Sequence, residues 1–374
     1  MSQQSPLRLG ILGLGTISRA VHLPLVARSA DVRLVAVADL DPVRAGELAA
    51  AYGARALNTE ELLQAPDVDA VLVATPGRHA ELAVAALRAG KHVLAEKPLA
   101  LSLPEVVAAE AAAVAAGRVL QVGYMKVHDG AVVAARAALA EIGELRLVQV
   151  SVRHPLDAPQ LAHLRLAPPG PLPESARPVV EAAEAGEAAA LDTVLAAVGA
   201  GESAEADAPW RRLFRSVLCG SVVHELSVLR ALGLGLPDRP DHAELLAWDG
   251  TAPPTLLVTA SPAPDVRCIL DWAWLPEFPG YTETVRLTGT AGEVELRMAP
   301  PYVLDTPSRL TVLSASGGGA REVRFDADGA FQRQLESFVA AVRTGDVHPD
   351  ATAAGAATDL VALQGILAHL RGRS

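Results

Sequence analysis

The sequence predicts an α/β protein with two domains: a Rossmann-type doubly wound parallel sheet, followed by an α+β domain with a mostly antiparallel, open sheet. Three observations predict it. Short apolar runs alternate with helical stretches in the first third of the chain, a glycine-rich turn follows the first run, and apolar and polar residues alternate one by one in the later segments. The length of 374 residues also favours two domains, because a single core stops growing at about 250–300 residues.

The strands expected in the first domain are continuous apolar runs, as in sheets covered by helices on both faces. They are Leu9–Leu12, Val32–Ala38, Ala70–Ala74, His92–Ala95 and Val119–Val122. Helices are expected between them. A capping box formed by Ser102 and Glu105 marks one helix start, and Gly90 and Gly117 mark helix ends. We place this dinucleotide-binding domain at residues 1–125.

The second domain, residues 126–374, begins with an excursion rich in proline and then in alanine and glutamate, at about 155–210. A helix from Trp210 to Leu232 should follow, and the chain should close with helices at Phe331–Thr344 and Ala351–Leu370. The alternating segments predict an antiparallel sheet with one covered face. They are Ala243–Trp248, Thr255–Ala260, Asp265–Trp274, Tyr281–Thr288, Glu293–Met298, Arg309–Leu313 and Arg321–Phe325.

Composition excludes several classes of function. A net charge of −11 argues against binding nucleic acid or an anionic membrane, both of which need a basic face. The two cysteines, Cys219 and Cys268, offer neither a disulfide framework nor metal-ligand spacing, so we expect no metal and a cytoplasmic location. No signal peptide is expected, and no apolar run approaches the ~18 residues of a spanning helix.

The glycine-rich turn contains Gly13, Gly15, Thr16 and Ile17, and Ser18 stands where a third small residue is common. Glycines let the backbone approach a pyrophosphate, whose charge is stabilised by free N–H groups at a helix start. The motif alone fits any tight strand-to-helix turn equally well.

Asp39, at the end of the second expected strand, strengthens the cofactor interpretation. Its carboxylate would accept hydrogen bonds from the adenosine ribose and repel a 2′-phosphate, which favours NAD over NADP. Arg44 leaves NADP open, because a nearby arginine can bind that phosphate. Asp39 could instead cap the turn beside Asp41.

Three segments closely resemble the Gfo/Idh/MocA family (glucose-fructose oxidoreductase, inositol dehydrogenase and rhizopine catabolism proteins). They are Ala74–His79, Ala89–Pro98 with its Glu96-Lys97-Pro98 run, and Gly123-Tyr124. The resemblance covers Leu7 to about Val150 and returns near Phe331–Gly345; between these parts it is weak.

The resemblance implies that Glu96 holds the nicotinamide ribose and that Lys97 bonds the reacting hydroxyl or carbonyl. A lysine beside the positive nicotinamide should exchange a proton near neutral pH. Thr75 and Pro76 would line the cofactor. His79 stands in a loop one residue shorter than in many relatives, so it either contacts the cofactor or caps the next helix.

In the second domain, family members commonly carry an aspartate four residues before a histidine on one helix. Here His224 is present, but Gly220 occupies the aspartate position. His224 could accept the proton alone, because histidine titrates near neutral pH, or be satisfied within the protein. Glu225 lies about 100° away around the helix. Tyr124, Lys126 and Glu225 are the candidates for binding substrate, and a packing role is an equal alternative for Tyr124 and Lys126.

Together these features predict an NAD(P)-dependent oxidoreductase that moves hydride between nicotinamide and a carbinol carbon of a sugar, inositol or related polyol. Two alternatives stay open: a glycosidase-type enzyme with transient oxidation by NAD, and a cofactor-binding regulatory protein favoured by Gly220. We also expect a homodimer or homotetramer formed through an apolar sheet face that carries Leu270, Trp272, Trp274 and Val285.

Overall fold

The computed structural model describes residues 5–372 except 165, 168–169, 200–202, 305, 316 and 326–328. It divides into two compact units. The first consists of Met1–Tyr124, Leu164–Thr193 and Gln334–Ala357, and the second of Met125–His163, Val194–Arg333 and Thr358–Ser374. The first break falls one residue before the expected boundary, but two later stretches return to the first unit. The division into residues 1–125 and 126–374 stays a prediction.

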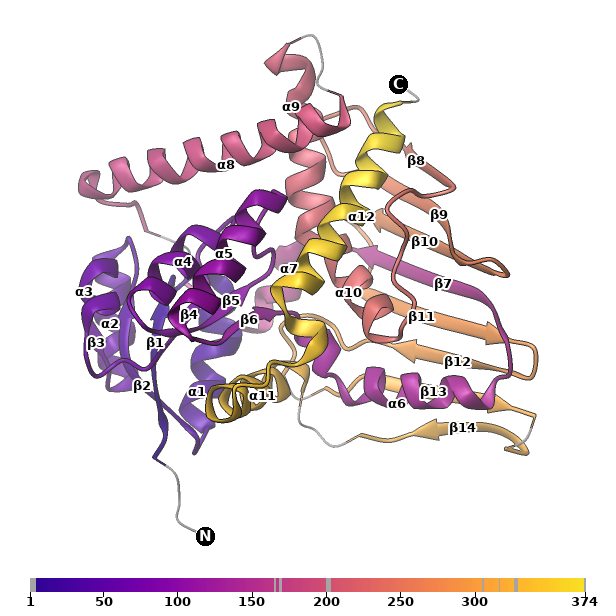
Figure 1. Cartoon of the computed structure of the whole chain (residues 1–374), viewed down its shortest axis with the longest axis horizontal. Helices are drawn as coiled ribbons and strands as arrows, with labels where there is room; N and C mark the ends of the chain where they lie inside the picture. The colour runs from indigo at the N-terminus through magenta and orange to yellow at the C-terminus, as the bar shows by residue number, and fades with distance from the viewer. Residues whose placement is uncertain are drawn as a thin grey trace. The chain divides into compact units, whose positions relative to one another are not determined.

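The first unit contains a six-stranded parallel sheet in the order β3-β2-β1-β4-β5-β6, which is the doubly wound arrangement expected (Figure 1). Its strands are β1 (Leu7–Leu12), β2 (Val32–Ala38), β3 (Arg55–Ala56), β4 (Ala70–Val73), β5 (His92–Glu96) and β6 (Leu120–Gly123). Its connecting helices are α1 (Leu23–Arg28), α2 (Pro42–Tyr52), α3 (Thr59–Gln64), α4 (Ala80–Arg88) and α5 (Leu103–Ala116). All five expected strands are present within one or two residues; only the short β3 was missed.

The capping box and the helix-ending glycines expected from the sequence are also present in the structure. Ser102 and Glu105 form the expected capping box of α5, and Gly117 ends that helix in the left-handed conformation. Gly90, with a φ of +77°, follows α4 in the same way. These ends fix the direction in which each helix returns to the sheet.

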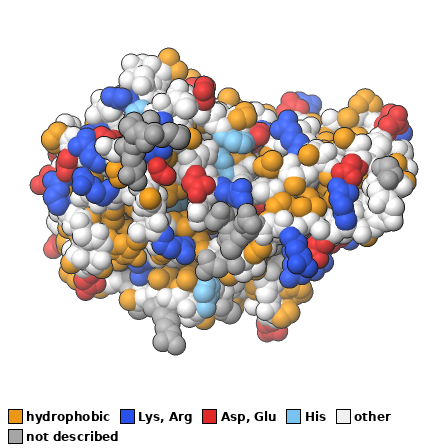
Figure 2. Space-filling model, turned by 90° about the horizontal axis from the view of Figure 1, so that it is seen from below, with side chains coloured by type: hydrophobic (Ala, Val, Ile, Leu, Met, Phe, Trp, Pro, Cys, Tyr) orange, Lys and Arg blue, Asp and Glu red, His pale blue; other side chains and the backbone are white. Residues whose placement is uncertain are grey.

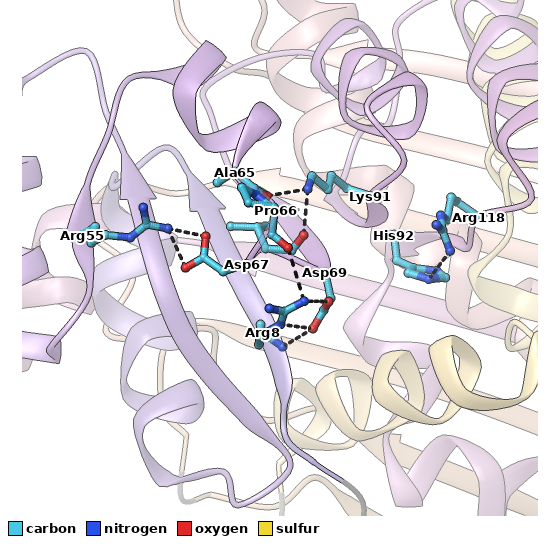
Figure 3. Close-up of polar contacts among 10 residues, drawn as sticks. Arg8, Arg55, Ala65, Pro66, Asp67, Asp69, Lys91, His92 and Arg118 are labelled. Carbon is cyan, nitrogen blue, oxygen red and sulfur yellow. Dashed lines mark hydrogen bonds and ion pairs between the residues drawn. The ribbon is translucent and has the colours of Figure 1, made fainter.

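The amino edge of this sheet is held together by charged side chains (Figure 3). Arg8 forms an ion pair with Asp69 at 2.6 Å, and Lys91 Nζ donates to the carbonyl oxygens of Ala65 at 2.7 Å and Val68 at 2.8 Å. Burial lowers the pKa of Lys91. This lysine of the family-like segment therefore ties down the loop after α3, at the edge opposite the carboxyl ends of the strands.

The second unit contains an eight-stranded sheet in the order β14-β13-β12-β11-β7-β10-β9-β8. Its strands are β7 (Leu145–His154), β8 (His242–Leu246), β9 (Thr255–Ala263), β10 (Val266–Trp274), β11 (Thr282–Gly289), β12 (Gly292–Arg297), β13 (Arg309–Ser314) and β14 (Gly319–Val323). All pairs are antiparallel except β7 with β10. Seven strands were expected; β7, near the middle of the sheet, was missed although its residues alternate.

The remaining helices follow the expected pattern. They are α6 (Gly130–Ala138), α7 (Asp157–Leu161), α8 (Arg177–Val198), α9 (Ala204–Arg212), α10 (Val223–Ala231), α11 (Ala330–Thr344) and α12 (Ala353–Arg371). Between α9 and α10 the backbone continues as a π-helical stretch, η6 (Leu213–Val222), so the expected 210–232 helix is one helical segment with a widened middle.

Three of the four residues expected on an apolar association face lie in the core. Leu270, Trp272 and Val285 are at most 2% exposed, whereas Trp274 is partly exposed. The alternation of side chains along β10 and β11 places the three buried residues in the core of their own unit. These three residues therefore do not form an association face, and the oligomeric state stays a prediction.

Helix α12 qualifies the expectation about membranes. By length and composition it could cross a bilayer, with a mean hydropathy of 1.3, but 56% of its apolar window is buried inside the protein. A core helix of a soluble protein has the same composition. On the face seen in Figure 2, basic side chains lie interspersed with acidic ones.

Candidate functional site

The glycine-rich turn after β1 is built for close approach of a ligand. Gly13 has a φ of +88°, and a Cβ there would stand 2.7 Å from the Ala74 carbonyl oxygen. A side chain at Gly15, by contrast, would meet nothing within 4 Å. The first glycine is thus required by the fold itself, whereas the second leaves open space at the start of a helix. Thr16 and Ile17, both partly exposed, are the first residues of that helix.

The helical segment after this turn begins at Thr16 and continues as a π-helical stretch from Ser18, whose hydroxyl donates to the Gly13 carbonyl oxygen at 2.6 Å. The first N–H groups of a helix lack acceptors within the helix, and the helix dipole makes this end positive. The open space at Gly15 and this helix start fit a pyrophosphate. Ser18 therefore closes the turn, while its neighbours are left to bind the ligand.

Asp39 lies at the end of β2 and holds the turn directly. Its carboxylate accepts hydrogen bonds from the backbone N–H groups of Leu14 at 2.7 Å and Asp41 at 2.8 Å. Arg44 lies 3.5 Å from Asp39 and 3.0 Å from Asp41, so it is paired with two carboxylates. Asp39 thus has the turn-capping role that was one alternative, and its contact with a cofactor stays a prediction.

Glu96, at the end of β5, has a partner that sequence reasoning missed. His22 Nε2 lies 2.7 Å from Glu96 Oε1, and Glu96 Oε2 accepts from the Lys97 backbone N–H at 3.3 Å. Burial alone would raise the pKa of Glu96, but His22 and the neighbouring positive charges hold it below its usual value. Glu96 is therefore a buried anion that joins β5 to the helix after the glycine turn.

Gly123, at the end of β6, explains another family-like position. A Cβ at Gly123 would come within 3.0 Å of the Glu96 Cα and 3.2 Å of its Oε2. Only glycine lets β6 pass so close to the end of β5. Tyr124, the next residue, is 1% exposed and thus packed inside the protein.

His79 is neither a side-chain cap nor an exposed ligand. Its Nδ1 lies 2.8 Å from the Pro98 carbonyl oxygen and its Nε2 lies 2.7 Å from the Thr75 carbonyl oxygen. Helix α4 has no side-chain cap from it. Burial lowers the pKa of His79. The ring therefore bridges the loop after β4 to the Lys97-Pro98 segment.

These contacts place Lys97 on a fixed backbone. Lys97 is partly exposed, its peptide bond to Pro98 is cis, and its two neighbours are bound by His22 and His79. Thr75 and Pro76 stand at the end of the adjacent strand β4. The cofactor-site candidates thus lie at or after the carboxyl ends of β1, β2, β4 and β5, as expected for an open α/β sheet.

In the second unit, Lys126 and Glu225 are placed side by side in the interior. Lys126 Nζ lies 3.2 Å from Glu225 Oε1 and 2.5 Å from Glu283 Oε2, and all three residues are at most 6% exposed. Tyr281 donates to Glu283 at 2.6 Å. These partners favour a structural role for Lys126 and Glu225 over direct substrate contact. The expected contact of both residues with substrate stays a prediction. Glu283 and Tyr281 carried no sequence signal beyond strand alternation.

This cluster holds more negative than positive charge. Burial raises the pKa of Glu225 to about 7, further raised by Glu283 and opposed by Lys126. Lys126 keeps its proton, because the two carboxylates outweigh burial and raise its pKa. Glu225 therefore retains its proton up to about neutral pH.

His224 is partly exposed at the start of α10, directly after the π-helical stretch that contains Gly220. A Cβ at Gly220 would meet only the Arg215 carbonyl oxygen, at 3.3 Å, so the missing side chain is not replaced by packing. Widened helical turns are frequent at functional sites. Cys219 and Cys268 are both buried, and burial raises the pKa of Cys268 to about 12. In the part of the chain that the structure describes, no group of three or more potential metal ligands is found.

A glycine turn on a doubly wound sheet, followed by a second unit with a large mixed sheet, defines a dinucleotide-binding protein of two domains. The profile of an oxidoreductase family with an NAD-binding Rossmann fold, GFO_IDH_MocA, matches residues 7–124. Residues 7–124 therefore match the Gfo/Idh/MocA oxidoreductase family, and this part of the chain carries its NAD(P)-binding Rossmann fold.

Curated relatives match part of the chain. An inositol 2-dehydrogenase of Rhizobium meliloti (strain 1021) is 37% identical over 161 residues, which are 42% of this chain and 48% of the relative. A dTDP-3,4-didehydro-2,6-dideoxy-alpha-D-glucose 3-reductase of Saccharopolyspora spinosa is 39% identical over 147 residues, 38% of this chain and 44% of the relative. The matches thus span about half the length of these relatives.

Solved structures resemble the whole chain in fold. A putative myo-inositol dehydrogenase from Sinorhizobium meliloti 1021 has a TM-score of 0.68 at 23% identity and covers 98% of both chains. A 3-ketoreductase from Actinomadura kijaniata, in complex with NADP and TDP-benzene, has a TM-score of 0.69 at 21% identity and covers 98% of this chain and 97% of its own. At such identities the likeness concerns the fold.

Proposed function

We propose that the protein is an NAD(P)-dependent oxidoreductase that transfers hydride between nicotinamide and a carbinol carbon of a sugar, inositol or related polyol. The observation that carries the proposal is the fixed placement of Lys97, whose neighbours Glu96 and Pro98 are held by His22 and His79 at the carboxyl edge of the sheet. The family and the named activities of its relatives support it.

The residues of the first unit have distinct tasks in this proposal. Gly13, Gly15, Thr16 and Ile17 bind the pyrophosphate, Asp39 faces the adenosine ribose, and Thr75 and Pro76 line the nicotinamide half. When bound, the nicotinamide supplies the hydride acceptor. Lys97 bonds the substrate oxygen and takes or gives its proton, while Glu96 keeps a negative charge beside that amine and faces the nicotinamide ribose.

His224 is the proposed second proton carrier, acting without the aspartate that Gly220 replaces. We propose NAD as the preferred cofactor, because Arg44 is already paired with Asp39 and Asp41 and would have to leave them to bind a 2′-phosphate. We further propose a cytoplasmic enzyme that forms a homodimer or homotetramer. Light scattering at micromolar concentration tests the last point, and a monomer there would refute it.

The activity is tested with a panel of cyclic and linear polyols and sugars, each with NAD and NADP, read by nicotinamide absorbance. Lys97→Met should lower kcat by about 10²–10⁴-fold, the usual contribution of a proton-transfer group, while cofactor affinity and Tm stay near wild type. Lys97→Arg, which keeps the charge, serves as the matched control and should retain cofactor binding.

Three outcomes contradict the proposal. Turnover unaffected by Lys97→Met removes the catalytic assignment. Cofactor stabilisation without turnover on any substrate supports the regulatory alternative instead, and turnover of a glycoside without net NADH would indicate the transient-oxidation mechanism.

A further inference from the structure

The excursion between β7 and α9 has no task in the proposed function. Part of it, Leu164–Thr193, belongs to the first unit, which also carries the glycine turn and Lys97. We call residues 166–167 and 170–193, which the structure describes, the strap. The strap consists of a loop and the larger part of α8. It contacts three loops at the carboxyl edge of the parallel sheet.

The first contact is with the helical segment that follows the glycine turn. Arg19, one residue after Ser18, donates from Nη1 to the Ala167 carbonyl oxygen at 2.8 Å. Burial lowers the pKa of Arg19, the charge of Arg44 lowers it further, and Asp39 opposes the shift. Because charges near a surface act at short range, Arg19 also lies close to the end of β2. The strap therefore begins beside the proposed adenosine side of the cofactor site.

The second contact is with the loop after β2. A Cβ at Gly170 would stand 3.6 Å from Asp41 Oδ2, which is ordinary van der Waals distance. The Asp41 carboxylate is itself fixed, because it caps the start of α2 and pairs with Arg44 at 3.0 Å. Gly170 thus packs against a rigid point two residues after Asp39, the residue proposed to face the adenosine ribose.

The third contact is between α8 and the loop after β4. A Cβ at Gly77 would come within 2.9 Å of Glu187 Oε2. A Cβ at Gly186 would overlap the guanidinium group of Arg78. That group is held in place by Glu105, 2.6 Å away at the start of α5. The two glycines therefore allow α8 to lie directly on the loop that the proposed function places along the nicotinamide half.

These contacts surround the place assigned to the dinucleotide. The loops after β1, β2 and β4 meet at the carboxyl edge of the sheet, where open α/β sheets bind their ligands. A Cβ at Gly15 would nevertheless meet nothing within 4 Å, although Arg19, four residues later, is bonded to the strap. The strap therefore rests on the rim of the proposed site and leaves the position of the pyrophosphate open.

The strap is attached by a small and largely polar surface. In the first part of α8, residues 177–189, all but three residues are exposed, and two of those three are Gly186 and Glu187. Ala176 and Leu191, on either side of this part, are buried. Segments with few buried apolar contacts open at a lower free energy than the core does. The middle of the strap can therefore lift while its two ends stay anchored.

We propose that the strap covers the dinucleotide site: it closes over the bound nicotinamide cofactor and has to lift from Gly77 and Arg19 before the cofactor can leave. The inference rests on the proposed function for the identity of the ligand. It adds that part of the excursion, outside residues 7–124, belongs to the cofactor site. Covering segments of this kind set the rate of exchange with solvent.

Hydrogen exchange of the full wild-type chain, with and without saturating NAD, tests the cover directly. Peptides from residues 170–187 should exchange more slowly when NAD is bound, together with those of the glycine turn. Peptides from β13 and β14, in the second unit, are the internal reference and should not change. Protection of the glycine turn without protection of the strap overturns the proposal.

Gly186→Leu places a side chain where the Arg78 guanidinium lies and should hold α8 away from its loop. Release of NADH, followed by its fluorescence in a stopped-flow chase with excess NAD, should become about tenfold faster or more, because contact losses act mainly on dissociation. Ala185→Leu is the matched control: this residue is exposed, about 100° away around the same helix. It should release NADH at the wild-type rate.

Glu187→Ala gives a second test if Gly186→Leu does not fold, which its Tm shows. It removes the carboxylate that lies on Gly77 and should also speed NADH release, whereas Glu184→Ala, at an exposed position of α8, should not. Wild-type release rates in both Gly186→Leu and Glu187→Ala overturn the proposal.

The outcomes separate the strap from the proposed function. Faster NADH release in the strap variants, without hydride transfer to any polyol or sugar, supports the strap and removes the proposed activity. Turnover of a polyol with unchanged release rates overturns the strap and leaves the oxidoreductase standing. A chain that binds neither NAD nor NADP overturns the strap as well.

Discussion

His22 and Glu96 form a buried pair in the first unit, with 2.7 Å between Nε2 and Oε1 and side-chain exposures of 6% and 9%. His22 belongs to the helical segment that follows the glycine turn, and Glu96 ends the strand that leads into Lys97. The pair therefore connects the proposed pyrophosphate site to the proposed catalytic lysine. It therefore stabilises both the glycine turn and the backbone that carries Lys97.

His22→Ala should destabilise the first unit, because it leaves the Glu96 carboxylate buried without its closest partner. Removing one partner of a buried pair costs about 3–5 kcal/mol. The pKa of Glu96 is held below its ordinary value of 4.5, so its stabilising effect is present above that pH and is lost as the pH falls through the lower folded value.

Thermal unfolding of wild type and His22→Ala at pH values from 3 to 7 measures this. The difference in Tm should be largest at pH 7 and shrink in acid. His22→Gln, which keeps a hydrogen-bond donor, should lose less. A His22→Ala variant as stable as wild type at pH 7 contradicts the assignment.

Gly13→Ala and Gly15→Ala should separate folding from cofactor binding. Alanine at Gly13 meets the Ala74 carbonyl oxygen at 2.7 Å and has to adopt a φ of +88°, so it should cost at least the ~1–2 kcal/mol of a left-handed residue and lower Tm. Alanine at Gly15 has open space and should leave Tm of the free protein unchanged.

Calorimetry with NAD completes this comparison. Gly15→Ala should weaken NAD binding at least tenfold, about 1.4 kcal/mol, because the methyl group occupies the space assigned to the pyrophosphate. Unchanged affinity would show that the cofactor does not pass Gly15.

His79→Leu should weaken cofactor binding and turnover together. It removes the bridge between the Thr75 and Pro98 carbonyl oxygens, both of which lie beside proposed cofactor or catalytic residues. We expect a loss of about 1–3 kcal/mol in stability for the unsatisfied carbonyl groups, with a rise in KM for NAD. His92→Leu, at the opposite edge of the sheet, is the matched control. Equal effects of both variants on KM would argue against a positioning role.

Glu225 should make stability depend on pH near neutrality. Burial raises its pKa from 4.5 to about 7, so the folded protein binds the proton more tightly than the unfolded chain does. The contribution of this group therefore falls as the pH rises from about 4.5 to about 7, and is constant above. Glu225→Gln, which mimics the protonated form, should lack this slope.

Tm of wild type relative to Glu225→Gln, recorded from pH 4.5 to 8.5, measures the effect. The wild-type advantage should decrease through this range and level off above pH 7. A difference that does not change with pH would mean that Glu225 stays ionised.

Much of the candidate cofactor site was predictable from local sequence. Gly13 and Asp39 stand at positions where chain geometry leaves few alternatives: a strand-to-helix turn with a positive φ and the end of the next parallel strand. The strand β7 carried an alternating signal that was overlooked at the domain boundary, and the widened turn before His224 carried none. Partners distant in sequence, such as His22 with Glu96 or Trp272 with Ser221, had no local pattern.

The order of strands and helices, the glycine turn and the family of the first unit followed from the sequence alone, because backbone conformation and apolar periodicity are local properties. Only the tertiary structure decided that Lys126 and Glu225 face each other in the interior and that Leu270 and Val285 belong to the core. Those outcomes depend on strand register and on which face of a sheet is covered. The sequence of one strand does not specify which strands lie beside it or in which register they pair.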